Sequence, residues 1–441
     1  MQFYLLKLGC PKNDVDADYL AGRLIAAGHR PVERPEEASA LIVNTCAFID
    51  DAKEESIDRI LELAVYKGGD ETLKLFVTGC LAQRYADELR SEIPEIDGIF
   101  GLGEWEQVAA AMSADRTTKQ TAITDSRLLT FKAGEDRYIS DRFPYAYLKI
   151  SDGCNRQCSY CVIPSIRGRF RSRSIDSIVR EAAYLARNGK REMILVSQDT
   201  TLFGRDLKDG SNLIGLLKAL DEIEAVEWIR VMYLHPAQVN ESLIEYLAAD
   251  GNKTLAYFDL PLQHIDSDLL KAMKRPYSEE RIRSLIESIR RASSRATIRS
   301  TFIVGFPGES QRQFERLLGF VEEMELDRVA AFAYSREEGT PAAELAQQID
   351  EKTRMQRLDG LMITQSEIAF DKNDSLIGTS VEVILDSLID ENTARGRTPG
   401  DCPEIDQEVV VCGSDLEAGQ VVQVRIEAVD GYDLIGKVVQ D

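Results

Sequence analysis

Three cysteines lie close together in the middle of the chain, in the string GCNRQCSYC. Cys154, Cys158 and Cys161 form the spacing CxxxCxxC directly after YAYLKIS, an apolar segment typical of a buried strand. Three thiolates so close in sequence can ligate three irons of a cubane cluster and leave the fourth iron without a protein ligand. Such an open iron can chelate the amino and carboxylate groups of a small molecule.

Two other interpretations of this cysteine set are possible. The spacing also places three side chains on one face of a helix, which would suit buried structural cysteines. A structural zinc site normally takes four nitrogen or sulfur ligands, often in CxxC pairs. The histidines that would complete such a site lie far away in the sequence, at His29, His235 and His264. Both interpretations fit the pattern less well than an iron–sulfur cluster does.

Three further cysteines, Cys10, Cys46 and Cys80, are distant in sequence, yet each follows an apolar strand-like segment: YLLKLGC, LIVNTC and LFVTGC. Because the carboxyl ends of parallel strands meet at one edge of a sheet, these cysteines can converge there and offer three ligands to a second cluster. Alternatively, they pack against helix starts as buried free cysteines. The remaining cysteines, Cys402 and Cys412, have no metal spacing and are interpreted as structural or incidental.

The composition is that of a globular protein without a membrane span. Of the 441 residues, 44% are hydrophobic and 7% aromatic, and no apolar run approaches the roughly 18 residues that a membrane helix needs. The N-terminus lacks the basic start and apolar run of an export signal, so we expect a cytoplasmic protein. In that compartment, eight cysteines favour metal or redox chemistry over a disulfide framework.

The charge balance is strongly acidic, with 53 basic and 75 acidic residues and a net charge of −22. Proteins that hold nucleic acid by its phosphates normally carry a basic face, so direct nucleic-acid binding is disfavoured. A basic protein partner suits such a surface better. The end of the chain is especially acidic: residues 376–441 contain 14 acidic and four basic residues, a net charge of −10.

Changes in hydrophobic periodicity divide the chain. Residues 1–112 alternate strand-like runs with amphipathic stretches, which predicts a parallel sheet covered by helices. Residues 113–142 are polar and look like a linker with short strands. Residues 143–373 hold six strand candidates separated by helices and a trailing helix, which predicts an incomplete (β/α) barrel. Residues 374–441 carry short β-branched runs separated by turn residues, which predicts a small antiparallel β-barrel.

The CxxxCxxC motif, with the aromatic Tyr160 before its third cysteine, resembles the radical S-adenosylmethionine superfamily. This resemblance implies that the cluster passes an electron to S-adenosylmethionine and releases a 5′-deoxyadenosyl radical. TFIVGFPGES, residues 301–310, resembles the GxIxGxxGE region of the superfamily, where glycines let backbone approach a ligand closely; an ordinary glycine–proline turn is the alternative. SQDTT, residues 197–201, follows the second barrel strand. The cofactor-binding residues implied are Tyr160, Gln198, Asp199, Ile303, Gly305, Gly308 and Glu309.

Two three-cysteine sets, a barrel and a terminal β-barrel resemble the methylthiotransferase family along essentially the whole chain. One branch of this family modifies an adenosine derivative in transfer RNA. The other modifies an aspartate of small-subunit ribosomal protein S-twelve. The chain resembles the second branch in five segments: LGCPKNDVDAD, NTCAFIDDAKEES, GCLAQRY, GCNRQCSYCVIPSIRGRFRSRS and LPLQHIDSDLLKAMKR. The chain departs from the family pattern at His235, where an aromatic residue is usual, and at Cys402, where alanine is common.

The resemblance implies an α/β fold: a Rossmann- or flavodoxin-like N-terminal domain, a partial (β/α)6 TIM-like radical SAM barrel and a TRAM-like β-barrel. It implies two 4Fe–4S clusters, with S-adenosylmethionine as methyl donor and radical source, and no side chain acting as catalytic acid or base. The implied partners are ribosomal protein S-twelve or the small ribosomal subunit, and a flavodoxin- or ferredoxin-like electron donor. A transfer RNA methylthiotransferase and a non-catalytic iron–sulfur assembly factor remain the alternatives.

Two charge patterns bear on the substrate. The acidic final segment would repel phosphates and attract a basic ribosomal protein, although a merely solvated acidic surface has the same composition. Four arginines alternate in IRGRFRSR and, in an extended segment, would lie on one side. Because arginine binds carboxylates in a bidentate manner, these side chains suit a substrate or cofactor carboxylate. A surface basic stretch paired with nearby acids is the alternative for Arg167, Arg169, Arg171 and Arg173.

Overall fold

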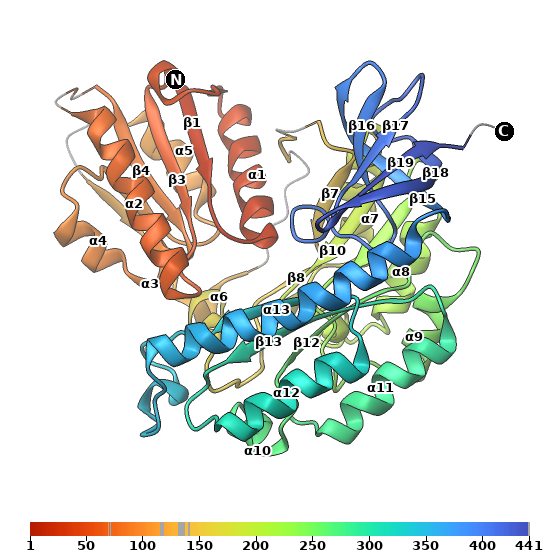
Figure 1. Ribbon diagram of the computed structural model, residues 1–441. Coiled ribbons are helices and arrows are strands. Elements are labelled where there is room, and N and C mark those ends of the chain that lie inside the picture. The colour runs from red at the N-terminus through yellow and green to blue at the C-terminus, as the bar shows by residue number, and fades with distance from the viewer. Residues whose placement is uncertain (69, 71, 115–118, 131–136, 140–141, 440–441) are drawn as a thin grey trace. The chain divides into compact units, whose positions relative to one another are not determined.

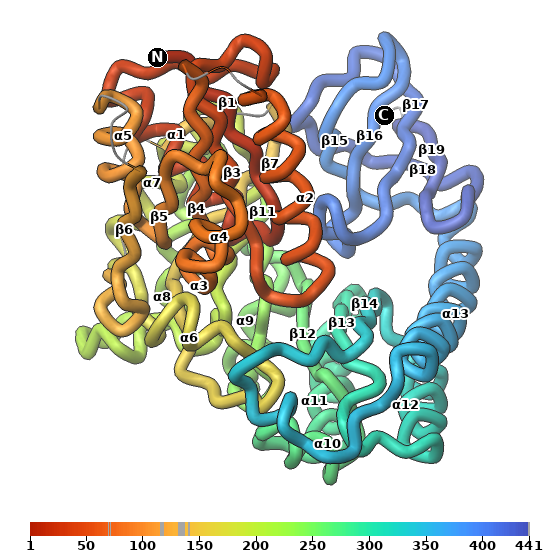
Figure 2. The backbone as a smooth tube through the Cα atoms, turned by 90° about the vertical axis from the view of Figure 1, so that its left-hand side faces the viewer, coloured from red at the N-terminus to blue at the C-terminus, as the bar shows by residue number. Residues whose placement is uncertain are grey.

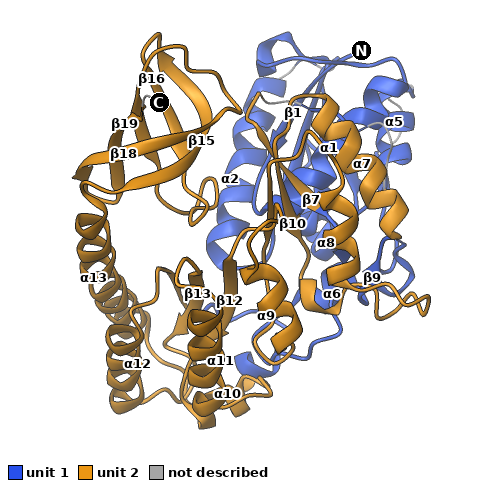
Figure 3. Cartoon of the chain, turned by 90° about the vertical axis from the view of Figure 1, so that its right-hand side faces the viewer, with its two compact units in different colours: residues 1–141, 149–173, 335–343 blue, residues 142–148, 174–334, 344–441 orange. Residues whose placement is uncertain are grey.

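The computed structural model describes residues 1–441 except 69, 71, 115–118, 131–136, 140–141 and 440–441. The chain forms two compact units, each assembled from segments distant in sequence (Figure 3). Unit 1 comprises residues 1–141, 149–173 and 335–343, and unit 2 comprises residues 142–148, 174–334 and 344–441. The CxxxCxxC loop therefore belongs to the same unit as the three N-terminal cysteines.

Unit 1 is built around a six-stranded parallel sheet with the strand order β2-β1-β3-β4-β5-β6. Strands β3 and β4 are buried along their whole length, as expected for a parallel sheet covered on both faces. The sheet confirms the parallel arrangement predicted for the first segment. β6 extends it into the predicted linker, part of which lies outside the described residues. The strands are β1 Gln2–Lys7, β2 Arg30–Pro31, β3 Ala40–Thr45, β4 Lys74–Gly79, β5 Gly98–Phe100 and β6 Gln120–Ala122.

Helices cover both faces of this sheet (Figure 1). α1 and α5 pack against one another on one face. On the other face, Ile60 of α2 and Leu89 of α4 share one core with Val43 and Val77 of the sheet. The helices are α1 Pro11–Ala26, α2 Asp50–Lys67, α3 Cys80–Arg84, α4 Ala86–Glu92 and α5 Trp105–Ser113.

Two later segments complete unit 1. In the first, β8 Ser151–Asp152 pairs with β9 Arg171–Ser172 in antiparallel fashion, and α6 Ile163–Arg167 packs on α3. The second segment, residues 335–343, is attached through Glu337, a buried carboxylate. Its Oε2 lies 2.7 Å from Nη1 of Arg84 and 3.1 Å from Nζ of Lys53.

Before α13, unit 2 forms two three-stranded sheets, ordered β11-β10-β7 and β12-β13-β14. An isolated parallel bridge pairs Ile229 of β11 with Thr254, which lies shortly before β12. This arrangement is the incomplete six-strand barrel predicted from the sequence. The strands are β7 Tyr145–Lys149, β10 Glu192–Val196, β11 Trp228–Val231, β12 Tyr257–Gln263, β13 Thr297–Val304 and β14 Arg328–Ala333.

The helices of unit 2 are amphipathic and bury one stripe each. In α11, for example, Ile282, Ile286 and Ile289 are buried at helical spacing while its charged residues face outward. The helices that follow the strands are α7 Ile175–Arg187, α8 Leu213–Asp221, α9 Glu241–Ala248, α10 Ser267–Ala272, α11 Glu279–Ala292 and α12 Gln311–Met324. Single 3₁₀ turns in the two units occupy Pro35–Glu37, Ser126–Leu128, Thr200–Leu202 and Pro341–Glu344.

The long helix α13, Glu351–Leu376, leads to a closed five-stranded barrel (Figure 2). The barrel order is β15-β16-β17-β19-β18, and its pairs are antiparallel except for the parallel pair β17–β19. It confirms the predicted terminal β-barrel. None of the described helices has the length and apolar character needed to cross a membrane. The strands are β15 Ser380–Asp390, β16 Thr393–Arg397, β17 Val409–Cys412, β18 Val421–Asp430 and β19 Asp433–Val438.

Candidate metal centre

The N-terminal cysteines lie at the carboxyl ends of three adjacent strands. Cys10 caps α1 after β1, Cys46 follows β3 directly, and Cys80 follows β4 as the first residue of α3. Their thiols interact: burial raises the pKa of Cys46, and Cys10 raises it further. Burial also raises the pKa of Cys80 to about 12, against the opposing charge of Arg167 and with added repulsion from the other two thiols. The fold therefore brings these three cysteines to one sheet edge.

Two glycines let the strand ends approach this closely. Gly9, directly before Cys10, has a φ of +93°, and a Cβ atom there would lie 2.6 Å from Cβ of Cys46. Gly79, directly before Cys80, has a φ of +95°, and a Cβ atom there would lie 2.5 Å from the carbonyl oxygen of Thr45. Both the backbone conformation and the available space thus favour glycine.

Asn13 ties the turns of Cys10 and Cys46 together. The backbone carbonyl oxygen of Asn13 accepts a hydrogen bond from the side-chain amide of Asn44 at 2.8 Å. The Ser56 hydroxyl holds Cys46 by accepting from its backbone nitrogen and donating to its carbonyl oxygen, both at 3.0 Å. The Asn13 amide nitrogen donates to three buried carbonyl oxygens, at 2.6, 3.3 and 3.2 Å, those of Leu8, Asn44 and Thr45.

The second cysteine set lies on the loop between β8 and α6, and its three members are half-buried. Gly153, before the first of them, has a φ of +74°, and a Cβ atom there would lie 2.2 Å from the carbonyl oxygen of Arg169. The backbone nitrogen of Cys154 donates to the carbonyl oxygen of Gly168 at 3.1 Å. The loop therefore closes on the residues that directly follow α6, which holds the first cysteine in place.

Both cysteine sets fit iron–sulfur clusters in donor type and number. Among the described residues, no three cysteine, histidine, aspartate or glutamate side chains are grouped to hold one metal ion. A cubane requires a different arrangement, because each thiolate binds a separate iron and the thiols therefore stand farther apart. Thiols must also lose their protons to bind iron, and the positive charge of Arg167 favours this by opposing the rise that burial causes in the pKa of Cys80.

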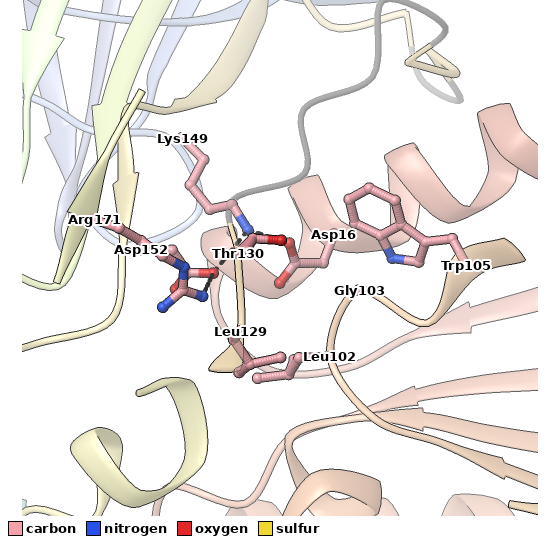
Figure 4. Close-up of a pocket in the computed structure, with 9 residues that line it drawn as sticks. All are labelled: Asp16, Leu102, Gly103, Trp105, Leu129, Thr130, Lys149, Asp152 and Arg171. Atoms are coloured by element: carbon pink, nitrogen blue, oxygen red, sulfur yellow. Dashed lines mark hydrogen bonds and ion pairs between the residues drawn. The ribbon is translucent and has the colours of Figure 1, made fainter. Parts of the chain in front are cut away.

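A network of buried charges reaches Cys80. Nη1 of Arg167 lies 3.0 Å from Oδ2 of Asp16 and 3.3 Å from Oδ1 of Asp152, and Lys149 pairs with the same carboxylates. Although burial raises the pKa of Asp152, Lys149 and Arg167 hold it well below its usual value. Figure 4 shows the hollow beside this network, lined by Asp16, Leu102, Gly103, Trp105, Leu129, Thr130, Lys149, Asp152 and Arg171.

The four alternating arginines occupy different environments. Arg167 and Arg173 are buried, Arg171 is half-buried, and Arg169 is exposed. Arg173 donates to the carbonyl oxygen of Lys149 at 3.0 Å. Arg171 donates to the carbonyl oxygens of Arg167 and Arg169, at 2.8 and 2.9 Å. The segment is therefore not a single cationic face; two of its guanidiniums support the interior of unit 1.

Tyr160 lies half-buried on the CxxxCxxC loop of unit 1, whereas the other predicted cofactor-binding residues belong to unit 2. Gln198 and Asp199 follow β10, the second strand of the barrel. Gln198 is half-buried, and Asp199 is buried with its carboxylate accepting a hydrogen bond from the Thr201 hydroxyl. These two residues stand where the strand meets the turn of residues 200–202.

The GxIxGxxGE region forms the end of β13 and the turn into α12. Ile303 is half-buried on β13. Gly305 and Gly308 have φ values of +71° and +87°, a conformation that glycine adopts without strain. The backbone nitrogen of Gly308 donates to the carbonyl oxygen of Gln347 at 2.8 Å, which holds the turn.

Glu309 holds this turn from the inside. Its Oε2 accepts from the backbone nitrogens of Gly305 and Phe306, the latter at 3.1 Å. Within the described part of the chain, its Oε1 and Nε2 of His264 have no hydrogen-bond partner, and they lie 4.0 Å apart. Burial raises the pKa of Glu309 to about 7, against the opposing charge of Arg357, and lowers that of His264 to about 4. His264 is therefore neutral near pH 7.

Two of these side chains were not among the predicted site residues. Asn13 lies three residues after Cys10, where a buried asparagine in the first turn of a helix needs partners for its amide. His264 follows Gln263, which ends β12 with a left-handed φ of +67°. For the cysteine turns themselves the sequence did contain a signal. A glycine directly precedes three of the six cysteines, at Gly9, Gly79 and Gly153, and this repeated glycine–cysteine pair indicates tight turns there.

Three family models match successive parts of the chain. Residues 2–101 match the uncharacterized protein family UPF0004, and residues 148–321 match the radical SAM superfamily. Residues 377–439 match the TRAM domain. The order of the matches is the order of the N-terminal sheet, the six-strand domain and the closed barrel.

Curated relatives extend along the full chain. Ribosomal protein uS12 methylthiotransferase RimO of Clostridioides difficile (strain 630) is 43% identical over 442 residues, covering 100% of this chain and 99% of the relative. The protein of the same name from Aquifex aeolicus (strain VF5) is 42% identical over 440 residues, covering 99% of this chain and 97% of the relative.

Solved structures share the fold at low identity. The radical S-adenosylmethionine methyltransferase TsrM from Kitasatospora setae, with cobalamin and a 4Fe–4S cluster bound, gives a TM-score of 0.53 at 15% identity, over 77% of this chain and 76% of that chain. The apo form of OxsB, a cobalamin-dependent S-adenosylmethionine radical enzyme, also gives 0.53, at 10% identity, over 81% and 56%. These likenesses concern the fold alone.

The match to the radical SAM superfamily over residues 148–321, a stretch that includes the CxxxCxxC motif, defines the class: the chain is a radical SAM enzyme. Sequence identity to relatives along the full length defines the family within this class. The chain belongs to the RimO family of ribosomal protein uS12 methylthiotransferases.

Proposed function

We propose that this protein inserts sulfur into a β C–H bond of an aspartate in ribosomal protein uS12 and leaves that sulfur methylated. The observation that carries the proposal is the presence of two three-cysteine sets in one compact unit. One cluster suffices to start radical chemistry, so a second set offers a place for the sulfur that joins the substrate. The name of the full-length relatives supports uS12 as the substrate.

In this proposal each set holds one 4Fe–4S cluster: Cys154, Cys158 and Cys161 the radical SAM cluster, and Cys10, Cys46 and Cys80 the auxiliary cluster. When bound, the clusters and S-adenosylmethionine supply the radical and the methylated sulfur, because a β C–H bond is inert toward acid–base groups. The protein's own contribution is positional. The glycine turns and the Asn13 hydrogen bonds hold the ligands, and burial excludes water from Cys46 and Cys80.

The proposed binding residues for S-adenosylmethionine differ in kind. The glycine turn of β13 offers backbone that a ligand can approach closely, and Glu309 fixes this turn through its hydrogen bonds. Of the four arginines, only the exposed Arg169 is retained for the substrate carboxylate. The full proposed set for S-adenosylmethionine is Tyr160, Gln198, Asp199, Ile303, Gly305, Gly308 and Glu309.

Iron and sulfide analysis tests the two-cluster assignment. Each of the variants Cys10→Ala and Cys154→Ala is expected to lose about half of the iron after reconstitution, because each disturbs one of two equal clusters. Cys412→Ala, a half-buried cysteine of the terminal barrel, serves as the control and should retain all of it. Full iron retention in Cys10→Ala would refute the auxiliary cluster.

Mass spectrometry of a deletion strain tests the substrate. The uS12 aspartate should lose its methylthio group while the modified adenosine of transfer RNA stays unchanged. Reintroduction of the gene should restore the methylthio group on uS12. The acidic terminal barrel favours this outcome, since a surface of that charge attracts a basic protein and repels phosphates. Loss of the transfer RNA modification instead would identify the other branch.

The remaining assignments extend the same proposal. A flavodoxin- or ferredoxin-like protein supplies electrons, and the reaction takes place in the cytoplasm, where uS12 and the small ribosomal subunit are made. The domain boundaries proposed are residues 1–112, 113–142, 143–373 and 374–441. An assembly factor without activity would fail to release 5′-deoxyadenosine when reduced with S-adenosylmethionine, and that failure would overturn the enzymatic function.

A further inference from the structure

The guanidinium of Arg167 contacts a cysteine of the N-terminal set. Its Nη2 lies 3.4 Å from Sγ of Cys80, within hydrogen-bond distance for a sulfur acceptor. Arg167 ends α6, the short helix after the CxxxCxxC motif, whereas Cys80 begins α3. The helix that follows one cysteine set thus supplies a donor to a member of the other set, within one compact unit.

Arg167 is held in this position from several sides. Its Nη1 contacts Asp16 and Asp152, and its Nη2 also lies 3.5 Å from Oδ1 of Asn13, the residue that ties the strand ends together. Arg167 is 1% exposed, so its guanidinium does not reach a substrate in solution. Arginine keeps its proton in proteins, and this guanidinium is paired with two buried carboxylates. The side chain is therefore a fixed positive charge beside sulfur.

We propose that Arg167 is a positioning residue that hydrogen-bonds the Cys80 ligand of the auxiliary cluster and raises the reduction potential of that cluster. This inference rests on the proposed function, because it requires a cluster on Cys10, Cys46 and Cys80. Hydrogen bonds to cluster sulfurs are among the interactions that set the potential of an iron–sulfur centre. Reduction adds a negative charge, and a nearby positive charge stabilises the reduced state more than the oxidised one.

The chain offers a matched control in Arg173. This arginine belongs to the same segment and is 4% exposed, and it donates to the carbonyl oxygen of Lys149 and, at 3.3 Å, to the Tyr19 hydroxyl. Arg167→Gln and Arg173→Gln each remove one buried positive charge. Comparison of the two separates a hydrogen bond to the cysteine ligand from a general loss of buried charge.

The experiment is a redox titration followed by electron paramagnetic resonance on the full-length chain. The background carries Cys154→Ala, Cys158→Ala and Cys161→Ala, so that only the auxiliary cluster contributes to the spectrum. At a fixed potential, Arg167→Gln is expected to lower the ratio of reduced to oxidised cluster at least tenfold, a shift of about 59 mV for one electron. Arg173→Gln is expected to leave the ratio within threefold of the background.

The outcomes separate this inference from the function on which it rests. An unchanged ratio in Arg167→Gln, with full iron content, overturns the inference alone. A background protein that binds no iron overturns both, because the auxiliary cluster itself is then missing. Equal shifts in Arg167→Gln and Arg173→Gln also overturn the inference, since general electrostatics would explain them.

A second measurement covers the case in which Arg167→Gln does not fold. Pulsed electron–nuclear double resonance on the background chain, grown with ¹⁵N-arginine and reduced, reports nitrogen nuclei close to the cluster. We expect a ¹⁵N coupling that disappears in Arg167→Lys, which keeps the buried positive charge opposite Asp16 and Asp152. The same coupling in both proteins would show that Arg167 is not the donor.

Discussion

Gly9 lies directly against Cys46, so that a Cβ atom at Gly9 would stand 2.6 Å from Cβ and 2.9 Å from Sγ of that cysteine. Gly9→Ala must therefore displace a proposed cluster ligand, and it also places alanine at a φ of +93°. We expect this variant to lose about half of its iron after reconstitution, as Cys46→Ala should. Iron and sulfide analysis of the full-length protein checks the result.

Gly28→Ala is the control for this prediction. Gly28 has a φ of +87°, close to that of Gly9, but a Cβ atom there would meet no atom within 4 Å. Its cost is therefore conformational only, about 1 kcal/mol of stability, and its iron content should equal that of the wild type. Equal iron in the two alanine variants would contradict a role for close packing at Gly9.

The second prediction concerns the hydrogen bonds that the Asn13 amide donates. Asn13→Ala leaves three buried carbonyl oxygens without this donor, and Asn13→Asp places a carboxylate among them. We expect Asn13→Ala to lower the free energy of unfolding by about 2–3 kcal/mol, and Asn13→Asp to lower it further through repulsion. Thermal denaturation of the unloaded protein and iron content after reconstitution measure the two consequences.

The matched control is Asn188→Ala, because the Asn188 amide also donates to a carbonyl oxygen, that of Tyr184 at 2.8 Å, but on an exposed helix end. Water replaces that bond, so the change in stability should be under about 1 kcal/mol. A similar loss in Asn13→Ala and Asn188→Ala would mean that the strand ends at the cysteines do not depend on the Asn13 bonds.

The convergence of the N-terminal cysteines was predictable because it follows from strand direction. In a parallel sheet every strand ends at the same edge, and Cys10, Cys46 and Cys80 each follow a strand. The six strands of the barrel and the terminal β-barrel followed from hydrophobic periodicity in the same way. These features depend on local pattern, which a single sequence contains.

The environments of individual charged side chains were not predictable, because they depend on contacts between distant segments. The alternation in IRGRFRSR predicted one cationic side, but Arg167 turns inward to Asp16, which lies 151 positions earlier in the chain. The motif around Glu309 predicted a place near the cofactor, whereas the raised pKa of Glu309 depends on burial and on the charge of Arg357. Spacing in a sequence does not report such contacts.

Glu309 predicts a pH dependence of stability. Its pKa of about 7 in the folded protein lies above the ordinary value of 4.5, so the folded state binds more protons between these pH values. Stability from this group is therefore present below about pH 4.5 and is lost as the pH rises through about 7. Relative to Glu309→Gln, the free energy of unfolding of the wild type should fall by about 3 kcal/mol between about pH 4.5 and about pH 7. Above about pH 7 the difference between the two proteins should change little.

The difference between the two proteins isolates this effect. Burial lowers the pKa of His264 to about 4, so this residue makes the protein less stable as the pH falls, opposite to the effect of Glu309. His264 is present in both proteins. Melting temperatures of wild type and Glu309→Gln should be compared at half-unit steps from about pH 5 to about pH 8. A difference in melting temperature that is independent of pH would contradict the raised pKa.

A buried ion network attaches the terminal barrel to the six-strand domain within unit 2. Nη2 of Arg397, on β16, lies 2.8 Å from Oε2 of Glu192 on β10, and its Nε lies 2.6 Å from Oδ2 of Asp386. Nε of Arg230 lies 2.7 Å from the other oxygen of Glu192. Glu192, Arg230 and Arg397 are at most 1% exposed. Removal of one cation from this network leaves buried carboxylates without a counter-charge.

Arg397→Met should therefore destabilise the attachment by about 3–5 kcal/mol, because an unpaired buried charge costs more than the pair contributes. Arg395→Met is the control on the same strand, since Arg395 is 57% exposed and its pair with Glu408 lies in solvent. Urea denaturation gives the loss of stability, and limited proteolysis followed by mass spectrometry locates it. We expect early cleavage between α13 and β19 in Arg397→Met and a wild-type pattern in Arg395→Met. Equal protease resistance of the two variants would show that the barrel is held by its apolar contacts instead.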